Sequence, residues 1–155
     1  MDHCHICHGR EPEGHVILLA MTTTSLNPIT AIPAAAPEDA LRHFENRLTV
    51  ETDCADVHAA LEVDGSGFVV LDVRSREMFD RGHVPGSVSL PKAEIDAARL
   101  NEYPPETIFV VYCAGPHCNG ANRAAIRIAG LGRPVKEMIG GAVGWIDEGF
   151  TLERS

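Results

Sequence analysis

Two cysteines, Cys113 and Cys118, lie in the segment VVYCAGPHCNGANR, where their surroundings suit thiol chemistry. An apolar run precedes Cys113, and the glycines and the proline after it allow the backbone to turn tightly. A helix that begins near Ala121 directs its positive end at the same loop, and this field favours a bound anion and lowers a cysteine pKa. The segment therefore predicts a site for a thiolate nucleophile or an oxyanion.

Short apolar runs predict the strands that position this loop. The runs FVVLDV at 68–73 and TIFVVYC at 107–113 are continuous, as in strands that are buried on both faces of a parallel sheet. Shorter strands are expected in LTVET, SVSLP and VKEMI, which are residues 48–52, 87–91 and 135–139. Cys113 then lies at the carboxyl end of a buried strand.

Helical patterns alternate with these runs. Apolar residues at helical spacing predict a helix over 37–48, with Pro37 in its first turn. Thr52 or Asp53 is expected to cap a second helix. The inward residues of that helix are predicted to be Val57, Ala60 and Leu61. Further helices are expected in the charged residues 75–83, in 121–132, and in a C-terminal segment that contains Trp145.

This alternation predicts an α/β fold with a mainly parallel central sheet and helices on both faces. Such sheets bind ligands at the carboxyl ends of their strands, where Cys113 is expected. The helix over 121–132 is predicted to pack through the apolar residues Ala125, Ile126, Ile128, Ala129 and Leu131.

Length and charge indicate one domain and exclude some partners. The chain has 155 residues, 45% of them hydrophobic, which is enough for one sizeable core. A net charge of −9 disfavours nucleic acid and anionic membranes as partners, and no apolar run is as long as a membrane span. The N-terminus lacks a secretion signal, so we expect a cytoplasmic protein whose five cysteines are thiols, metal ligands or catalysts.

The first 36 residues differ in composition from the rest of the chain. From Met21 to Pro37 the chain is rich in Thr, Ser, Pro and Ala, and residues 1–36 are expected to be a disordered tail before a domain at 37–155. Met21 is an alternative natural start. The segment MDHCHICH places Cys4 and Cys7 at CxxC spacing among histidines, but it lacks a distant second pair, so no metal site is assigned.

Several separate motifs resemble the rhodanese family over residues 50–151. They are LDVR at 71–74, Glu77, GHVPGS at 82–87, the cysteine loop, and Gly140–Gly141 with Trp145. The resemblance implies a sulfurtransferase whose loop cysteine takes sulfane sulfur from a donor, forms a persulfide and passes the sulfur to a thiol or cyanide. It implies a small sulfur-donor anion and a thiol acceptor as partners, and no metal or organic cofactor. It does not indicate a protein partner.

The loop departs from the common pattern of that family, in which six residues begin with the cysteine and often end in arginine. If Cys113 heads the loop, the loop is about two residues longer than usual; if Cys118 heads it, CNGANR ends correctly at Arg123 but the following helix is about one turn short. Loops tolerate insertions better than packed helices tolerate deletions, which favours Cys113. A third alternative uses both cysteines, with Cys118 resolving an oxidised or persulfidated Cys113 as a disulfide.

The candidate site therefore consists of two catalytic cysteines, Cys113 and Cys118, and the loop around them. The expected substrate-binding residues are Ala114, Gly115, Pro116, His117, Asn119, Gly120, Ala121 and Arg123. One alternative is a rhodanese-like module that binds a partner without catalysis. A weaker one is a cysteine-based phosphatase or arsenate reductase, because those loops place five residues between cysteine and arginine and only four separate Cys118 from Arg123.

Other polar residues near the motifs are expected to be structural. Asp72 directly follows a buried strand, where an aspartate commonly caps the next turn or pairs with an arginine such as Arg74. His83 is expected to satisfy backbone groups in a turn. Cys54 and Trp145 are expected in the core.

Overall fold

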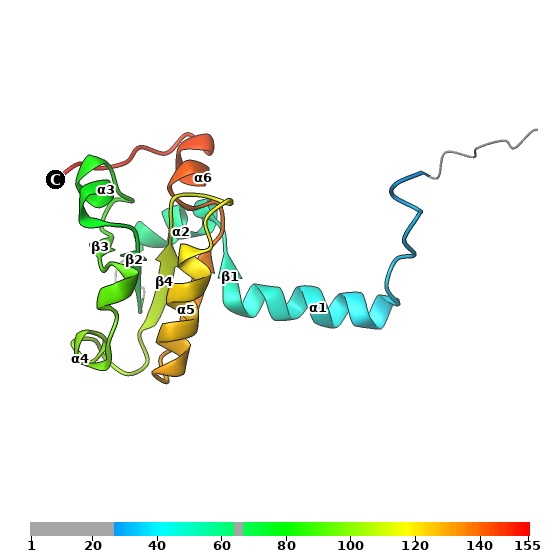
Figure 1. The fold of residues 1–155 in the computed structure, drawn as a ribbon, viewed down its shortest axis with the longest axis horizontal. Coiled ribbons are helices and arrows are strands. Elements are labelled where there is room, and N and C mark those ends of the chain that lie inside the picture. The colour runs from blue at the N-terminus through cyan, green and yellow to red at the C-terminus, as the bar shows by residue number, and fades with distance from the viewer. Residues whose placement is uncertain (1–26, 64–66) are drawn as a thin grey trace, which may run out of the picture. The chain divides into compact units, whose positions relative to one another are not determined.

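A computed structural model describes residues 27–63 and 67–155 (Figure 1). Residues Ala36–Ser155 form one compact unit. In the described part of the chain the longer helices are α1 (Pro37–Val50), α2 (Cys54–Leu61), α3 (Arg76–Arg81), α5 (Gly120–Gly130) and α6 (Gly141–Asp147). The strands are β1 (Glu51–Thr52), β2 (Phe68–Asp72), β3 (Val88–Ser89), β4 (Ile108–Tyr112) and β5 (Val135–Met138). Two short helices, η1 (Lys92–Glu94) and α4 (Ala97–Leu100), precede β4.

The five strands form one parallel sheet in the order β1-β5-β4-β2-β3. β4 lies in the middle and pairs with β2 along its whole length, so that Tyr112 is opposite Asp72. Because all strands run in the same direction, their carboxyl ends meet at one edge. Cys113 directly follows β4 at this edge, which confirms the predicted fold class and the predicted position of this cysteine.

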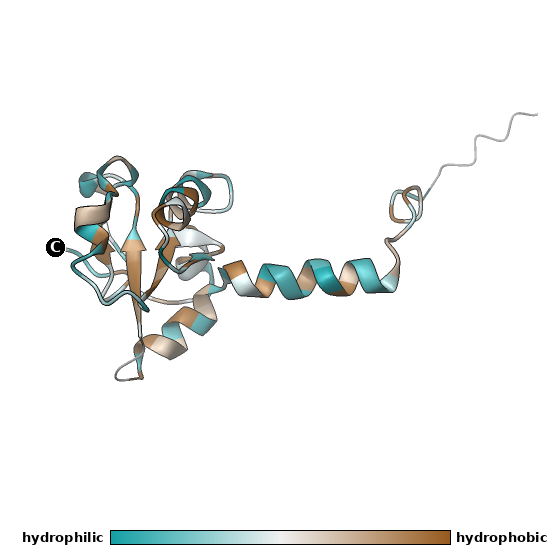
Figure 2. Ribbon diagram, turned by 90° about the horizontal axis from the view of Figure 1, so that it is seen from below, coloured by the Kyte–Doolittle hydropathy of each residue, from teal (hydrophilic) through white to brown (hydrophobic). Residues whose placement is uncertain are grey.

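Alternating side chains of β2 and β4 divide the core into two layers. Leu71, Phe109 and Val111 pack with α4 and α5 on one face of the sheet. Val70 and Val110 pack with α2 and α6 on the other face. Both faces of these strands are covered, which explains their continuous apolar sequences, and Figure 2 shows the strands in the brown of apolar residues.

The N-terminal helix differs from its prediction at its carboxyl end and on its apolar face. α1 continues through Val50, so the strand predicted at 48–52 is reduced to the two residues of β1. None of its side chains is buried, and its apolar residues Leu41, Phe44 and Leu48 remain exposed. The sequence pattern predicted the helix correctly, but a regular apolar spacing does not guarantee a partner surface.

The apolar faces of α2 and α5 are narrower than predicted. Asp53 caps α2 by accepting a hydrogen bond from the Asp56 backbone N–H, and Cys54 and Val57 are buried, whereas Leu61 is exposed. In α5 the buried residues are Ala121, Ala124 and Ile128. The predicted inward residues Ile126, Ala129 and Leu131 are exposed, because α5 touches the sheet along only one narrow line.

Some expectations lie outside the described residues. These are Cys4, Cys7 and most of the predicted tail. Residues 27–36, which are described, contain a turn in which Ala31 N–H donates to the Asn27 carbonyl. In the described residues, no helix is both long and apolar enough to cross a membrane.

Candidate functional site

The cysteine loop is held at its start by backbone bonds to α6. The carbonyl oxygens of Cys113 and Ala114 accept hydrogen bonds from the N–H groups of Ala142 and Val143, at 3.0 and 2.9 Å. Gly141 has a φ of +61°, and a Cβ atom there would collide with the Cys113 carbonyl oxygen. This close approach explains why α6 begins with a glycine.

The two cysteine sulfurs lie together over the first residue of α5. A Cβ atom on Gly120 would lie 2.6 Å from the Cys113 sulfur and 3.2 Å from the Cys118 sulfur, so only glycine leaves room for both. A turn in which Cys118 N–H donates to the Gly115 carbonyl at 3.0 Å brings the loop back to this point. The sequence predicted the loop, and the structure shows that its two cysteines meet.

The closeness of the two sulfurs lowers the pKa of one cysteine and raises the pKa of the other. The Cys113 thiol donates a hydrogen bond to the Cys118 sulfur and lowers the pKa of Cys118, and the Gly120 backbone N–H adds a second hydrogen bond at 3.4 Å. The positive charge of Lys92 lowers the pKa of Cys118 further. Burial and the hydrogen bond to Cys118 raise the pKa of Cys113 to about 11. Cys118 is therefore the more acidic of the two thiols, and Cys113 is the one that holds its proton more tightly.

Both cysteines open onto a cavity of about 260 Å³ at the carboxyl edge of the sheet. Cys113 is 8% exposed, whereas Cys118 is partly exposed at the end of the turn. Two carboxylates, Glu51 and Glu137, line the same cavity. Burial and the nearby charge of Glu51 raise the pKa of Glu137. The cavity therefore combines two thiols with acidic side chains.

The structure brings together only some of the predicted substrate-binding residues. Besides the cysteines, the predicted residues that line the cavity are Gly115, Pro116 and Ala121. Five other predicted residues are not among the described residues that line the cavity: Ala114, His117, Asn119, Gly120 and Arg123. Of these, Ala114 and Gly120 still act on the cysteines, because their backbone N–H groups bond to the cysteine sulfurs. The side chains of His117, Asn119 and Arg123 are exposed.

Other cavity residues were missed from the sequence. They are Glu51, Asn122, Glu137, Met138, Ile139, Gly140 and Gly141. Most of them lie at or just after the carboxyl end of β5, which pairs with β4, and Glu51 lies on β1, which pairs with β5. Ligands bind at the carboxyl edge of a parallel sheet, and this rule could have pointed to these residues. To apply it, one must know which strands lie beside β4, and the sequence does not show the strand order.

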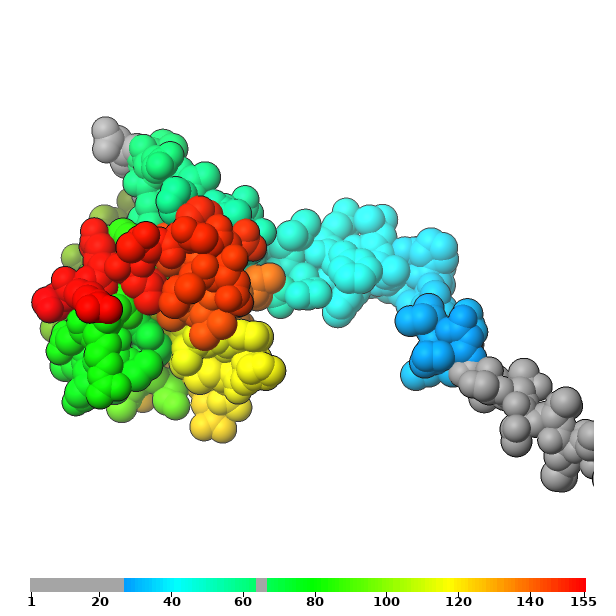
Figure 3. Space-filling view, turned by 90° about the horizontal axis from the view of Figure 1, so that it is seen from above, coloured from blue at the N-terminus to red at the C-terminus, as the bar shows by residue number. Residues whose placement is uncertain are grey.

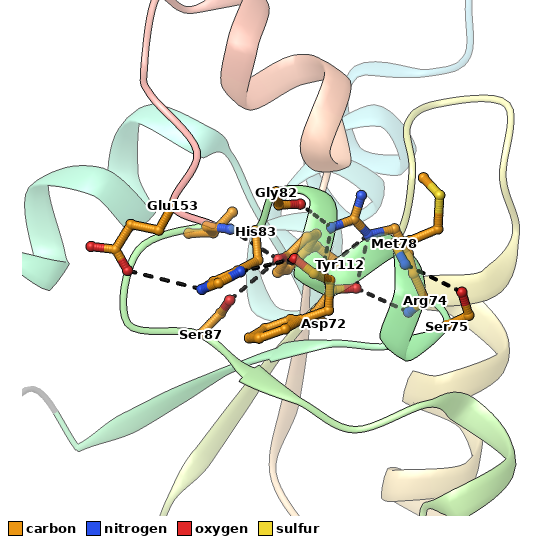
Figure 4. Close-up of polar contacts among 11 residues, drawn as sticks. Asp72, Arg74, Ser75, Met78, Gly82, His83, Ser87, Tyr112 and Glu153 are labelled. Carbon is orange, nitrogen blue, oxygen red and sulfur yellow. Dashed lines mark hydrogen bonds and ion pairs between the residues drawn. The ribbon is translucent and has the colours of Figure 1, made fainter. Parts of the chain in front are cut away.

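A buried polar network lies at the end of β2, on the edge that carries the cysteines (Figure 4). Asp72 is fully buried and accepts hydrogen bonds from the Arg74 backbone N–H, from Arg74 Nε at 2.9 Å, and from the Tyr112 hydroxyl at 2.7 Å. Burial opposes the charge of Arg74, but its bonds to Asp72 raise the pKa of the guanidinium. Asp72 both caps the turn and pairs with Arg74, which confirms the structural roles predicted for these residues.

The same network reaches the C-terminal segment through the turn after α3. The Tyr112 hydroxyl accepts from Val84 N–H at 3.0 Å, and the Arg74 guanidinium donates to the Gly82 carbonyl at 2.7 Å. His83 exchanges two backbone hydrogen bonds with Glu153, each 2.9 Å long, and its Nδ1 lies 3.0 Å from the Phe79 carbonyl. Figure 3 shows the red C-terminal residues against the green segment that contains α3. His83 thus has the structural role predicted for it.

The comparison with known proteins agrees with this architecture. Residues 54–148 match the family model of the rhodanese-like domain. The chain is 39% identical over 86 residues to the HTH-type transcriptional regulator Rv0324 of Mycobacterium tuberculosis, a match that covers 55% of this chain and 37% of that protein. The chain thus spans well under two thirds of the length of this curated relative.

Two solved structures show the likeness in three dimensions. The BH2092 protein from Bacillus halodurans is 37% identical with a TM-score of 0.73, and the match covers 77% of this chain and 87% of that one. A thiosulfate sulfurtransferase from Pseudomonas aeruginosa is 29% identical with a TM-score of 0.58, and the match covers 75% of this chain and 21% of that one. With the family model matched over more than half of its length, the chain belongs to the family of rhodanese-like domains.

Proposed function

We propose that the protein is a sulfurtransferase in which Cys118 takes sulfane sulfur from a donor and carries it as a persulfide. The observation that carries the proposal is the partly exposed Cys118 sulfur in the cavity, whose pKa is lowered by hydrogen bonds from the Cys113 thiol and the Gly120 N–H. A thiolate is the form of cysteine that attacks sulfane sulfur. The similarity to a thiosulfate sulfurtransferase supports the same class of reaction.

The choice of Cys118 reverses the preference for Cys113 that the loop length suggested. Cys113 is fixed by the sheet, but it is buried and its raised pKa keeps it protonated at neutral pH. Cys118 is more accessible and its pKa is lowered. Because the attacking group must be ionised and must reach the donor, we assign the sulfur-accepting role to Cys118 and a proton-donating role to Cys113.

The acidic lining of the cavity favours a donor with little negative charge. Glu51 and Glu137 line the cavity beside the cysteines, and the described lining residues include no lysine or arginine. Arg47 pairs with Glu51 at 2.7 Å and compensates its charge, so Glu137 is the carboxylate that disfavours a dianion such as thiosulfate, whereas an organic persulfide presents a thiol-like end. We therefore propose an organic or protein persulfide as the donor and a thiol as the final reductant or acceptor.

The same lining argues against phosphate or arsenate chemistry. Enzymes that bind a tetrahedral dianion need positive charge around it, and Arg123, the only arginine near the loop in its sequence, is exposed and outside the cavity lining. The charged residues that line the cavity are instead the carboxylates Glu51 and Glu137. Phosphatase activity is accordingly the weaker alternative.

The test of the proposed function is whole-protein mass spectrometry of the Cys113→Ser variant after incubation with glutathione persulfide. Serine keeps a hydrogen-bond donor beside Cys118 but cannot itself hold sulfur. We expect a mass gain of one sulfur atom, located on Cys118 by peptide mapping and removed by cyanide as thiocyanate. No gain with any persulfide donor would instead indicate a rhodanese-like module that binds without catalysis.

Replacing Glu137 by glutamine should make thiosulfate a better donor. Removing one negative charge from the cavity lowers the repulsion of a dianion, and we expect the rate of thiocyanate formation from thiosulfate and cyanide to rise by roughly tenfold, or about 1.4 kcal/mol. The matched control is Glu106→Gln, which changes the net charge equally at an exposed residue before β4, at the opposite edge of the sheet. Equal rates for the two variants would show that the cavity carboxylates do not select the donor.

A further inference from the structure

The contact between the two cysteine sulfurs is unfavourable for a simple carrier of sulfur. A carrier must keep its persulfide intact until an external acceptor arrives. Here both sulfurs lie within 3.2 Å of the position that a Cβ atom on Gly120 would take. A persulfide on Cys118 is therefore formed next to a thiol of the same chain.

We propose that the protein does not pass the sulfur on intact but reduces it and releases it as sulfide, while Cys113 and Cys118 close to a disulfide. This inference rests on the proposed uptake of sulfur by Cys118. It makes the protein a persulfide reductase, whose product is hydrogen sulfide and whose oxidised form is an intramolecular disulfide.

The reaction balances without any further oxidant. In the first step the Cys118 thiolate attacks the outer sulfur of an organic persulfide, the sulfur–sulfur bond of the donor breaks, and the donor leaves as a thiolate. In the second step the Cys113 sulfur attacks the Cys118 sulfur, the new sulfur–sulfur bond of the persulfide breaks, and the outer sulfur leaves as hydrosulfide. The sulfane sulfur is reduced by two electrons, and the two thiols are oxidised to the disulfide. An external dithiol returns the protein to its starting form.

The geometry supports the second step in two ways. A thiol that is held in contact acts at an effective concentration far above that of any thiol in solution, so it reacts before an external acceptor does. The Cys113 thiol loses its proton as its sulfur attacks, and the hydrosulfide that departs beside it can take up this proton. The Gly120 position, without a Cβ atom, leaves space for the sulfurs to join.

The test is a single turnover of the reduced full-length protein with glutathione persulfide, without any added thiol. We expect one sulfide released per chain, measured by a sulfide-specific trap. We also expect a protein mass that is lower by two hydrogen atoms, with peptide mapping that joins Cys113 to Cys118. A full-length control with Cys4→Ser and Cys7→Ser should give the same result, which excludes a disulfide between those two cysteines.

The Cys113→Ser variant separates this inference from the proposed function. If the variant gains one sulfur atom and releases no sulfide, both are supported. If the unchanged protein also keeps its added sulfur under the same conditions, sulfide release is wrong while sulfur uptake stands. If the variant gains the glutathione moiety instead of a sulfur atom, sulfide came from attack on the inner sulfur of the donor, and the proposed route is overturned. If the variant gains nothing, the proposed uptake itself is wrong.

Discussion

Replacing Asp72 by alanine should lower the free energy of unfolding by about 3–5 kcal/mol, because it leaves the Arg74 guanidinium buried without its partner. The Arg74 side chain is 7% exposed and donates two ways to Asp72, from Nε at 2.9 and 3.0 Å and from a terminal nitrogen at 2.5 Å. The substitution also removes the acceptor of the buried Tyr112 hydroxyl. Such a loss is a large part of the stability of a small domain. Urea denaturation followed by circular dichroism measures it.

Two further variants test this explanation. Asp80→Ala removes an exposed carboxylate of α3 and should change the unfolding free energy by less than about 0.5 kcal/mol. The double variant Asp72→Ala with Arg74→Met should recover part of the loss, because it removes the unpaired charge as well. A double variant that is less stable than Asp72→Ala would show that Arg74 contributes mainly through its bond to the Gly82 carbonyl and its position over the Tyr112 ring.

The fold could be predicted from the sequence because its central strands carry an unambiguous signal. Apart from Asp72 at the end of β2, the runs that became β2 and β4 consist of apolar and aromatic residues, and a strand with both faces covered has few alternatives. The short edge strands were harder. β1 and β3 have only two residues each, and there the neighbouring helix or turn decides where pairing begins.

The sequence predicted that the loop is the site, but it could not predict which role each of the two cysteines has. Which cysteine carries the charge depends on how closely two sulfurs approach and which N–H groups face them, and both are set by the turn at Gly115 and by α5. Similarly, Glu137 becomes a cavity residue only because β5 lies beside β4. Spacing along the chain contains neither kind of information.

Replacing Cys118 by serine should abolish sulfur uptake, because the remaining cavity thiol is the one that the fold keeps protonated. A serine hydroxyl does not ionise at ordinary pH and cannot hold sulfane sulfur. Cys113 remains buried in this variant, and burial is the largest cause of its raised pKa, so it does not take over the role at neutral pH. We expect the rate at which glutathione persulfide is consumed to fall to the uncatalysed rate, whereas Cys113→Ser keeps its first turnover.

The pH dependence of alkylation provides an independent measurement of the same assignment. A lowered pKa means that Cys118 ionises at a lower pH than an ordinary cysteine, so iodoacetamide should modify Cys118 in the unchanged protein with a midpoint below the pKa of an ordinary cysteine. In Cys118→Ser the cavity thiol is Cys113, whose raised pKa moves the midpoint above that value. Peptide mapping assigns each adduct to its cysteine. Rapid modification of Cys113 at neutral pH, with sulfur uptake preserved in Cys118→Ser, would return the nucleophilic role to the cysteine at the end of β4.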